Sequence, residues 1–311
     1  MIKLDHVTKK FGPHMAVDDL NLAVPAGEIY GLLGHNGAGK STAIGMMLGQ
    51  VWPTCGDVAI CGHNISTQRK KALQHVGALF ETPAFYDYLS GWRNLEILSS
   101  YSARTPRKRI AEVVEWVGLT GREHSKVRTY SHGMRSRLAI AQALLPQPEL
   151  LILDEPSDGL DPEGIHEMRQ TILRLHRELR LTILLSSHLL NEVEQLCTRI
   201  AVLSKGRRVF EGDLAATRSR GQWVRLQVRD FTAATALLQQ AQLIGQARDA
   251  QYIALHPGVG TDRVVQFLVG AGMPVFEIAR EEQTLESFYL SLMDENRKAG
   301  GAALAVPHGG R

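Results

Sequence analysis

The chain has 311 residues, 44% of them hydrophobic and 22% charged, which is typical of a globular protein with a buried core. This length allows one large domain or two smaller ones. The net charge of +3 is small for the length and does not indicate a dedicated nucleic-acid binder, so we expect no nucleic acid partner. The 3 cysteines have no CxxC spacing, which favours a reduced, cytosolic compartment.

The sequence lacks the patterns of a signal peptide and of a membrane-spanning helix. Its first residues are charged, and no run approaches the about 18 consecutive apolar residues that cross a bilayer. Any link to a membrane is therefore expected to run through a partner protein. Basic clusters at 69–71 and 104–109 are interpreted as solvated helix faces.

Strands and helices alternate over the first two thirds of the chain. Polar alternation or short apolar runs predict strands, and apolar residues at helical spacing predict helices. The predicted strands are 2–7, 15–24, 28–34, 57–62, 150–153 and 181–188; the predicted helices are 42–48, 162–179 and most of 88–143. Buried strands separated by helices at this spacing indicate a parallel sheet covered by helices.

The pattern changes near residue 215. Strands are predicted at 223–229, 251–256 and 274–280, each before a short helical stretch, which indicates a small α/β module over 216–296. The apolar face of its last helix comprises Leu285, Phe288, Tyr289 and Leu292. Residues 297–311 are rich in Gly and Ala and are expected to form a disordered tail.

A glycine-rich stretch, GLLGHNGAGKST (31–42), lies between a predicted strand and a predicted helix and fits G-x-x-x-x-G-K-[ST]. Its glycines let backbone N–H groups point inward, and the following helix N-terminus adds partial positive charge, so the loop can hold phosphate oxygens. In such loops the lysine reaches the β- and γ-phosphates, and the hydroxyl binds Mg²⁺. The expected contacts to a nucleoside triphosphate and its Mg²⁺ are Gly34, His35, Asn36, Gly37, Ala38, Gly39, Lys40, Ser41 and Thr42.

Two neighbouring acids, Asp154 and Glu155, follow the buried strand 150–153. Adjacent side chains at a strand end point in different directions, so the two carboxylates can take different roles. Asp154 is expected to hold Mg²⁺, and Glu155 is expected to act as the general base that polarises the attacking water. Solvated acids at a strand end are common, but the phosphate loop makes the functional interpretation the stronger one.

Several ordered motifs resemble those of the nucleotide-binding subunits of ATP-binding cassette (ABC) transporters. YSHGMRSRL (130–138) stands where the family has its signature, and SDGLD (157–161) is similar to its D-loop. His188 matches the family's switch histidine, and Phe11, in KKFG, matches the aromatic residue that stacks on adenine. Each residue alone has an ordinary explanation, such as a helix cap for Ser131; the ordered set favours the family over residues 1 to about 215.

The resemblance implies a P-loop NTPase cassette with a RecA-like core, an N-terminal antiparallel β subdomain and a helical subdomain over about 85–145. It implies that Ser131 and Gly133 of one copy close on ATP held by a second copy, with Lys40, Glu155 and His188 as the catalytic residues. The implied partners are that second copy and a transmembrane permease. The implied location is the cytoplasmic face of the inner or plasma membrane, peripheral through the permease.

The sequence departs from the family pattern at two positions. The signature Leu-Ser-Gly-Gly-Gln here reads Tyr-Ser-His-Gly-Met, so His132 replaces the first glycine and the backbone approach there is less close. Glu81 stands where the family usually has glutamine, and an acid there can still hold Mg²⁺ or water. After this acid, the residues that the resemblance places against the permease are Phe85, Tyr86 and Leu89.

The stretch ETPAFYDYLSGWRNL and the ending FEIAREEQTLESFYLSLM resemble the branch that exports drugs and peptide antibiotics, such as the bacitracin-resistance and lantibiotic-immunity transporters. A branch that serves copper delivery has similar features, so this alternative stays open. Soluble ATPases of DNA repair or chromosome organisation carry a long coiled coil, and those of translation carry two cassettes, neither of which is visible here. A regulatory scaffold that binds ATP without hydrolysis would not need Lys40, Asp154, Glu155 and His188 together.

Overall fold

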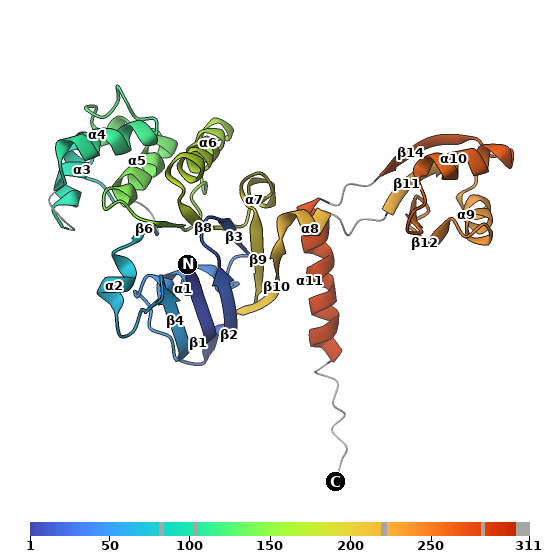
Figure 1. Ribbon diagram of the computed structural model, residues 1–311, viewed down its shortest axis with the longest axis horizontal. Coiled ribbons are helices and arrows are strands. Elements are labelled where there is room, and N and C mark those ends of the chain that lie inside the picture. Colours follow the sequence, from blue (N-terminus) through green and yellow to red (C-terminus); the bar gives the residue numbers. More distant parts are fainter. Residues whose placement is uncertain (81–83, 102–104, 219–222, 281–283, 303–311) are drawn as a thin grey trace, which may run out of the picture. The chain divides into compact units, whose positions relative to one another are not determined.

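The computed structural model describes residues 1–80, 84–101, 105–218, 223–280 and 284–302 (Figure 1). Residue contacts divide it into two compact units. The first unit contains Met1–Leu214 and the described residues from Leu292 onward, and the second is Ala215–Ser291. Each unit has its own hydrophobic core, so each is described by itself.

An antiparallel sheet forms the N-terminal layer of the first unit. Its strands are β1 (Ile2–Phe11), β2 (His14–Val24), β4 (Cys55–Ile60) and β5 (His63–Asn64), in the order β2-β1-β4-β5. Strands β1 and β2 form a hairpin that pairs Phe11 directly with His14, so these two side chains share a face. The predicted strands 2–7 and 15–24 are confirmed, and β1 continues beyond its prediction to Phe11.

A six-stranded sheet forms the second layer of the first unit. Its strands are β3 (Ile29–Leu33), β6 (Val76–Leu79), β7 (Leu150–Leu153), β8 (Thr182–Ser187), β9 (Arg199–Ser204) and β10 (Arg207–Asp213). Their order is β10-β9-β3-β8-β7-β6, and all neighbours are parallel except β10, which is antiparallel to β9. The predicted parallel sheet is therefore confirmed, whereas the sequence analysis missed β6, β9 and β10.

Helices complete the first unit around these sheets (Figure 1). Three of them, α3 (Gly91–Ser99), α4 (Arg107–Trp116) and α5 (His132–Leu144), pack together within the segment predicted as mostly helical, and α5 also contacts β6. The short α2 (Arg69–Leu73) exposes its three basic residues and buries Ala72, as expected of a solvated face. The others are α1 (Lys40–Met47), the short 3-10 helix η1 (Val127–Thr129), α6 (Pro162–Leu179) and α7 (Leu190–Leu196). Helix α8 (Leu214–Arg218) begins at the last residue of the segment Met1–Leu214 and continues into the second unit.

The strands that lead to the phosphate loop and the two acids are fully buried. All residues of β3, β7 and β8 are buried, in agreement with their apolar sequences. Packing around β3 is tight, because a Cβ on Gly31 would lie 2.9 Å from the Cys197 Sγ. A rigid sheet therefore carries the loops that follow β3, β7 and β8 at one edge.

The second unit is a four-stranded antiparallel sheet with two helices. Its elements are β11 (Trp223–Val228), α9 (Phe231–Gln240), β12 (Ile244–Arg248), β13 (Tyr252–Leu255), α10 (Thr261–Gly270) and β14 (Val275–Arg280). The β-α-β-β-α-β order and the sheet order β12-β13-β11-β14 are those of the ferredoxin-like motif. The sequence analysis missed β12 because only Ile244 of that strand is buried, so its apolar pattern is weak.

The last helix is longer than predicted. Helix α11 spans Leu285–Ala302, with Leu285 and Phe288 buried. The disordered tail predicted for 297–311 is therefore wrong over 297–302, and 303–311 lie outside the described residues. Once a helix is nucleated, each added residue contributes a hydrogen bond, and Lys298 and Ala299 are good helix formers, so α11 extends into the Gly/Ala-rich stretch.

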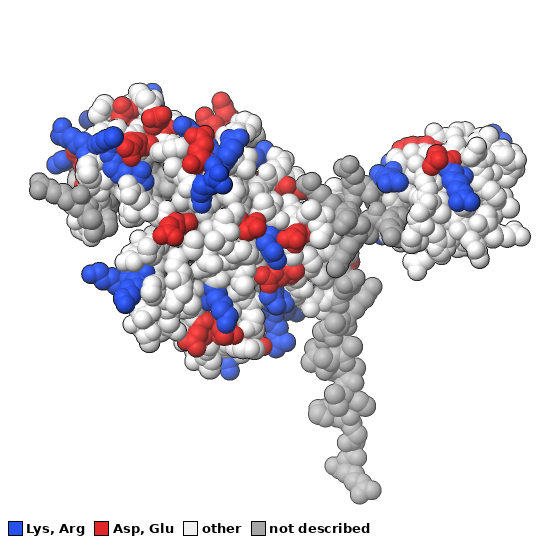
Figure 2. Space-filling model, viewed as in Figure 1, with Lys and Arg blue, Asp and Glu red and all other residues white. Residues whose placement is uncertain are grey.

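Charged side chains of both signs are intermingled on the face shown in Figure 2. This distribution agrees with the small net charge of +3. Among the described residues, none of the helices combines the length and apolar character that crossing a bilayer requires.

Gly77 on β6 offers a test of how tightly the helical layer packs on the sheet. A Cβ at this position would lie 2.3 Å from the Ala143 backbone oxygen on α5. Gly77→Ala is therefore expected to lower the free energy of unfolding by about 1–3 kcal/mol, measured by urea denaturation. Ala78→Ser, at an exposed position of the same strand, is the control and should change it by less than about 0.5 kcal/mol. Equal midpoints for the two variants would contradict this packing.

Candidate functional site

The glycine-rich loop runs from the end of β3 to the start of α1 and is shaped by two close approaches. Gly34 has φ +159, and a Cβ there would lie 2.7 Å from the Leu203 backbone oxygen. Gly39 has φ +102, in the left-handed region, and a Cβ there would lie 2.6 Å from the Ala16 backbone oxygen. Because neither position has room for a side chain, the loop backbone itself faces the space above it.

Lys40, the first residue of α1, is a nearly buried cation. Its side chain is 5% exposed, and its Nζ donates to the Gly34 carbonyl oxygen at 2.7 Å. The same Nζ lies 3.0 Å from the Glu155 Oε1, so the buried charge is paired. Lysine and glutamate far apart in the sequence thus meet directly above the loop.

Glu155 is held in place by its backbone as well as by this ion pair. It has φ +47, a left-handed conformation that a non-glycine residue adopts only when its surroundings hold it there. Its backbone N–H donates to the Ser186 Oγ at 2.9 Å, and the same hydroxyl donates to the Asp154 Oδ1 at 2.5 Å. Ser186 therefore fixes both acids, and the sequence analysis missed it because only the register of β7 on β8 brings it opposite Asp154.

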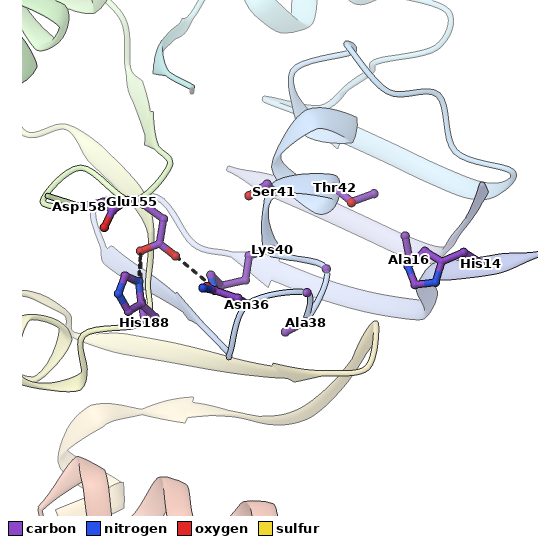
Figure 3. A pocket seen from close by; sticks show the side chains of 12 residues that line it. His14, Ala16, Asn36, Ala38, Lys40, Ser41, Thr42, Glu155, Asp158 and His188 are labelled. Carbon is purple, nitrogen blue, oxygen red and sulfur yellow. Dashed lines mark hydrogen bonds and ion pairs between the residues drawn. The ribbon is translucent and has the colours of Figure 1, made fainter. Parts of the chain in front are cut away.

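His188 follows β8 and contacts the second oxygen of Glu155. Its Nδ1 lies 2.8 Å from the Glu155 Oε2, and its backbone N–H donates to that oxygen at 3.3 Å. Figure 3 shows Glu155 between Lys40 and His188, joined to each by a dashed line. The three residues predicted as catalytic therefore form one continuous chain of contacts.

A cavity of about 470 Å³ opens above this chain. Glu155, Asp158 and His188 lie at one end of it, and His14 and Ala16 lie at the other (Figure 3). Its lining consists of His14, Ala16, Asn36, Gly37, Ala38, Gly39, Lys40, Ser41, Thr42, Glu155, Asp158 and His188. Most of the predicted loop contacts therefore line the same cavity as Glu155, Asp158 and His188.

Some predicted site residues lie outside this lining. Gly34 and His35 shape the loop without lining the cavity, and Asp154 is held beside it by Ser186. Phe11 is 49% exposed and lies under the Lys9 Nζ, which is 4.8 Å from its ring centre. Its hairpin partner His14 lines the cavity instead. Glu81 lies outside the described residues.

His14, Ala16 and Asp158 are cavity residues that the sequence analysis did not assign. His14 and Ala16 belong to β2, which reaches the loop through the hydrogen bond from the Asp18 N–H to the Gly206 oxygen and from the Gly206 N–H to the Ala38 oxygen. Asp158 belongs to the predicted D-loop, so its motif could have identified it as a site residue. His14 stands next to the hairpin turn, and only its position near Phe11 could have pointed to it.

The signature residues Ser131 and Gly133 do not reach the cavity of their own chain. Ser131 caps α5, its side chain accepting from the Met134 N–H at 3.2 Å, and it is exposed. Gly133 is buried, with the Gly164 Cα 3.5 Å from where its Cβ would be.

The residues at the cavity fit a magnesium triphosphate. Backbone of Asn36–Gly39 faces the cavity, a buried ammonium lies at its base, and the hydroxyls of Ser41 and Thr42 stand at the N-terminus of α1. Among the described residues, no cluster of three or more His, Cys, Asp or Glu side chains could hold a metal.

The bacitracin transport ATP-binding protein BcrA of Bacillus licheniformis is 38% identical to this chain over 297 residues, 94% of this chain and 97% of that protein. The uncharacterized ABC transporter ATP-binding protein YhcH of Bacillus subtilis is also 38% identical, over 96% of this chain and 97% of that protein. The linearmycin resistance ATP-binding protein LnrL of Bacillus subtilis is 37% identical over 68% of this chain and 69% of that protein. Two of the three similarities include the C-terminal unit.

Solved structures and a family model agree with these relatives. CbiO1 of Clostridium perfringens, part of an ABC transporter complex, covers 70% of this chain and 90% of its own at 26% identity and a TM-score of 0.64. The dimeric cassette MJ0796 bound to ADP and Pi covers 69% and 99% at 26% identity and a TM-score of 0.61. The family model described as ABC transporter matches residues 17–158. The chain is therefore a P-loop ATPase that belongs to the ATP-binding proteins of the ABC transporter family.

Proposed function

We propose that this chain is the ATP-hydrolysing subunit of an exporter of drugs or peptide antibiotics and acts on a separate transmembrane permease. The observation that carries the ATPase assignment is the contact chain Lys40–Glu155–His188 at the base of the phosphate-loop cavity. The similarity to BcrA over nearly its whole length, C-terminal unit included, supports the antibiotic cargo. It favours this branch over copper delivery and over soluble ATPases.

The loop and Lys40 bind the triphosphate in this proposal. Inward backbone amides and the N-terminus of α1 receive the α- and β-phosphate oxygens, and Lys40 reaches the γ-phosphate. His14 lies at the opposite end of the cavity from Glu155, where the adenine is expected, and Phe11 is its partner in the hairpin. Ser41 and Asp154 would hold Mg²⁺, which, when bound, neutralises charge on the phosphates.

Glu155 is the proposed base, and its ion pair with Lys40 gives it a second role. An incoming γ-phosphate competes for the Lys40 ammonium, because a phosphate carries more negative charge than one carboxylate. Transfer of Lys40 to the phosphate leaves the Glu155 carboxylate free to accept a proton from the attacking water. His188 keeps its contact with the Glu155 Oε2 and orients that carboxylate.

A second copy completes the site in this proposal. The exposed Ser131 at the N-terminus of α5 would face the γ-phosphate bound by the other copy, as the resemblance implies. Two copies related by a twofold axis would then bury two nucleotides between them. ATP that binds the closed pair more tightly than the open pair shifts the population towards closure, and hydrolysis reverses the shift.

The segment 84–90 is the proposed permease contact on the helical layer. Tyr86 and Tyr88 are 41% and 68% exposed, with their rings 6.0 Å apart. The buried Asn94 holds this segment in place, accepting from the Tyr86 N–H at 2.8 Å and donating to the Tyr86 oxygen at 3.1 Å. Exposed aromatic rings on a fixed backbone suit a protein interface, and this contact would place the chain at the cytoplasmic face of the membrane.

Lys40→Ala tests the phosphate-binding role. The variant removes the ammonium that reaches the γ-phosphate, so it should bind MgATP at least about 10-fold more weakly, by isothermal titration. Lys70→Ala, the same substitution at an exposed position of α2 outside the cavity lining, is the control and should leave the Kd within about twofold. An unchanged Kd for Lys40→Ala would contradict the assignment.

Glu155→Gln separates binding from chemistry. The amide keeps the shape of the side chain but cannot accept the proton of the attacking water, so kcat should fall at least about 100-fold. MgATP should still bind, and the variant should accumulate as an ATP-bound dimer in size-exclusion chromatography. Turnover near that of the unchanged protein would refute Glu155 as the base.

The permease assignment is tested by co-purification. Tagged chain, expressed from its own genomic neighbourhood, should retain a polytopic membrane protein in detergent, and reconstitution of the pair should stimulate ATP hydrolysis. Tyr86→Ala together with Tyr88→Ala should weaken this association while basal ATP hydrolysis stays within about twofold, since neither ring lines the cavity. Purification without any membrane protein would argue for a soluble ATPase.

A further inference from the structure

The segment proposed above as the permease contact pairs with the chain that leads into the signature motif. The Arg128 N–H donates to the Asp87 backbone oxygen at 3.0 Å, and the Val127 N–H donates to the Leu89 backbone oxygen at 2.9 Å. An isolated antiparallel bridge continues the pairing beyond these residues. The two stretches are therefore joined by backbone hydrogen bonds, which side-chain rotation does not break.

Packing is closest at Tyr130, the residue before the signature Ser131. The Tyr130 ring is buried, and its hydroxyl donates to the Arg122 backbone oxygen at 2.8 Å. A Cβ on Gly91, the first residue of α3, would lie 2.4 Å from that hydroxyl. The approach to the signature serine is thus packed against the start of α3, directly after the proposed permease contact.

One ion pair extends this contact past the signature serine. The Arg135 Nη2 lies 2.9 Å from the Asp87 Oδ1, and the two side chains are 32% and 56% exposed. Arg135 is one turn along α5 from Ser131, whose backbone oxygen accepts from the Arg135 N–H at 3.0 Å. Asp87 therefore holds residues on both sides of the signature serine, Arg128 with its backbone oxygen and Arg135 with its carboxylate.

Asp87 also stands between the two exposed rings of the proposed contact. Tyr86 and Tyr88 flank it in the sequence, and both are exposed. A partner that presses on these rings would bear on the residue between them. Displacement of this segment would then pass to Arg135 and into the first turns of α5.

We propose that Asp87 and Arg135 are positioning residues, which couple the permease contact to the signature serine at the N-terminus of α5. A permease that shifts the segment would thereby change how Ser131 meets the γ-phosphate bound by the second copy. Neither side chain lines the nucleotide cavity of its own chain, so the pair acts through Ser131. This inference rests on the proposed permease contact and on the proposed role of Ser131.

Two competing explanations give each residue a separate role. In one, Asp87 contacts the permease directly, so Asp87→Asn would reduce the amount of bound permease. In the other, Arg135 adds positive charge beside the γ-phosphate of the second copy, so Arg135→Gln would slow basal hydrolysis. Neither explanation predicts that the effect of one substitution depends on the other residue.

The test is a double-mutant cycle on the full chain co-purified with its permease. Asp87→Asn and Arg135→Gln should each lower permease-stimulated ATP hydrolysis about threefold, a size within the range for an exposed ion pair. Basal hydrolysis and the amount of bound permease should stay within about 1.5-fold. The double variant should also be about threefold lower, because both substitutions remove the same contact. Arg135→Lys keeps the positive charge and should retain the stimulated rate within about 1.5-fold.

Arg225→Gln is the matched control, because it makes the same substitution in an ion pair of similar length and exposure on the second unit. Arg225 lies 3.0 Å from Glu277, and their side chains are 43% and 40% exposed. The control should keep the stimulated rate within about 1.5-fold.

Additive losses of about ninefold in the double variant, or unchanged stimulation in both single variants, would overturn the coupling role. So would loss of bound permease in Asp87→Asn or a slower basal rate in Arg135→Gln, since either assigns the residue to a direct contact. In these cases the unchanged chain still retains its permease, and the proposed function stands. Purification of the unchanged chain without any membrane protein would instead overturn the proposed function, and this inference with it.

Discussion

The pairing of the buried Lys40 ammonium with the Glu155 carboxylate is the interaction on which the site depends. A nearly buried cation needs a partner, and here its partner is the group assigned as the base. The pair links the end of β3 to the end of β7, and His188 adds the end of β8. Three neighbouring strands of one sheet therefore deliver their residues to one point, and the parallel order β3-β8-β7 makes this possible, because all three end at the same edge.

The rigidity of that edge comes from burial. Strands β3, β7 and β8 are buried over their whole length, and Gly31 is packed so closely that a methyl group would collide with Cys197. This buried sheet can hold Glu155 in a left-handed backbone conformation, which is unfavourable unless the surrounding structure holds the residue in it. Ser186 contributes from within β8, where its hydroxyl accepts from the Glu155 backbone N–H and donates to the Asp154 carboxylate. The residues assigned to the reaction thus lie after the ends of the strands, and the buried sheet fixes their positions relative to one another.

The two units differ in the features that they contain. The first contains the cavity, the signature helix and the exposed tyrosines of the helical layer. The second is a small antiparallel sheet with two helices and its own core. The similarity to YhcH and BcrA covers 96% and 94% of this chain, so it extends into this second unit.

The sequence alone determined the phosphate loop, the acids after strand 150–153 and the parallel sheet, because glycine spacing and uninterrupted apolar runs are local features that restrict the backbone directly. It did not reveal β6, β9, β10 or β12, whose apolar patterns are short or one-sided, and it placed the end of the helix at Ala302 in a disordered tail. Only the tertiary structure brought Ser186 opposite Asp154 and His14 to the cavity. These contacts join residues far apart in the chain, and they are decided by strand register and helix packing, which no local pattern encodes.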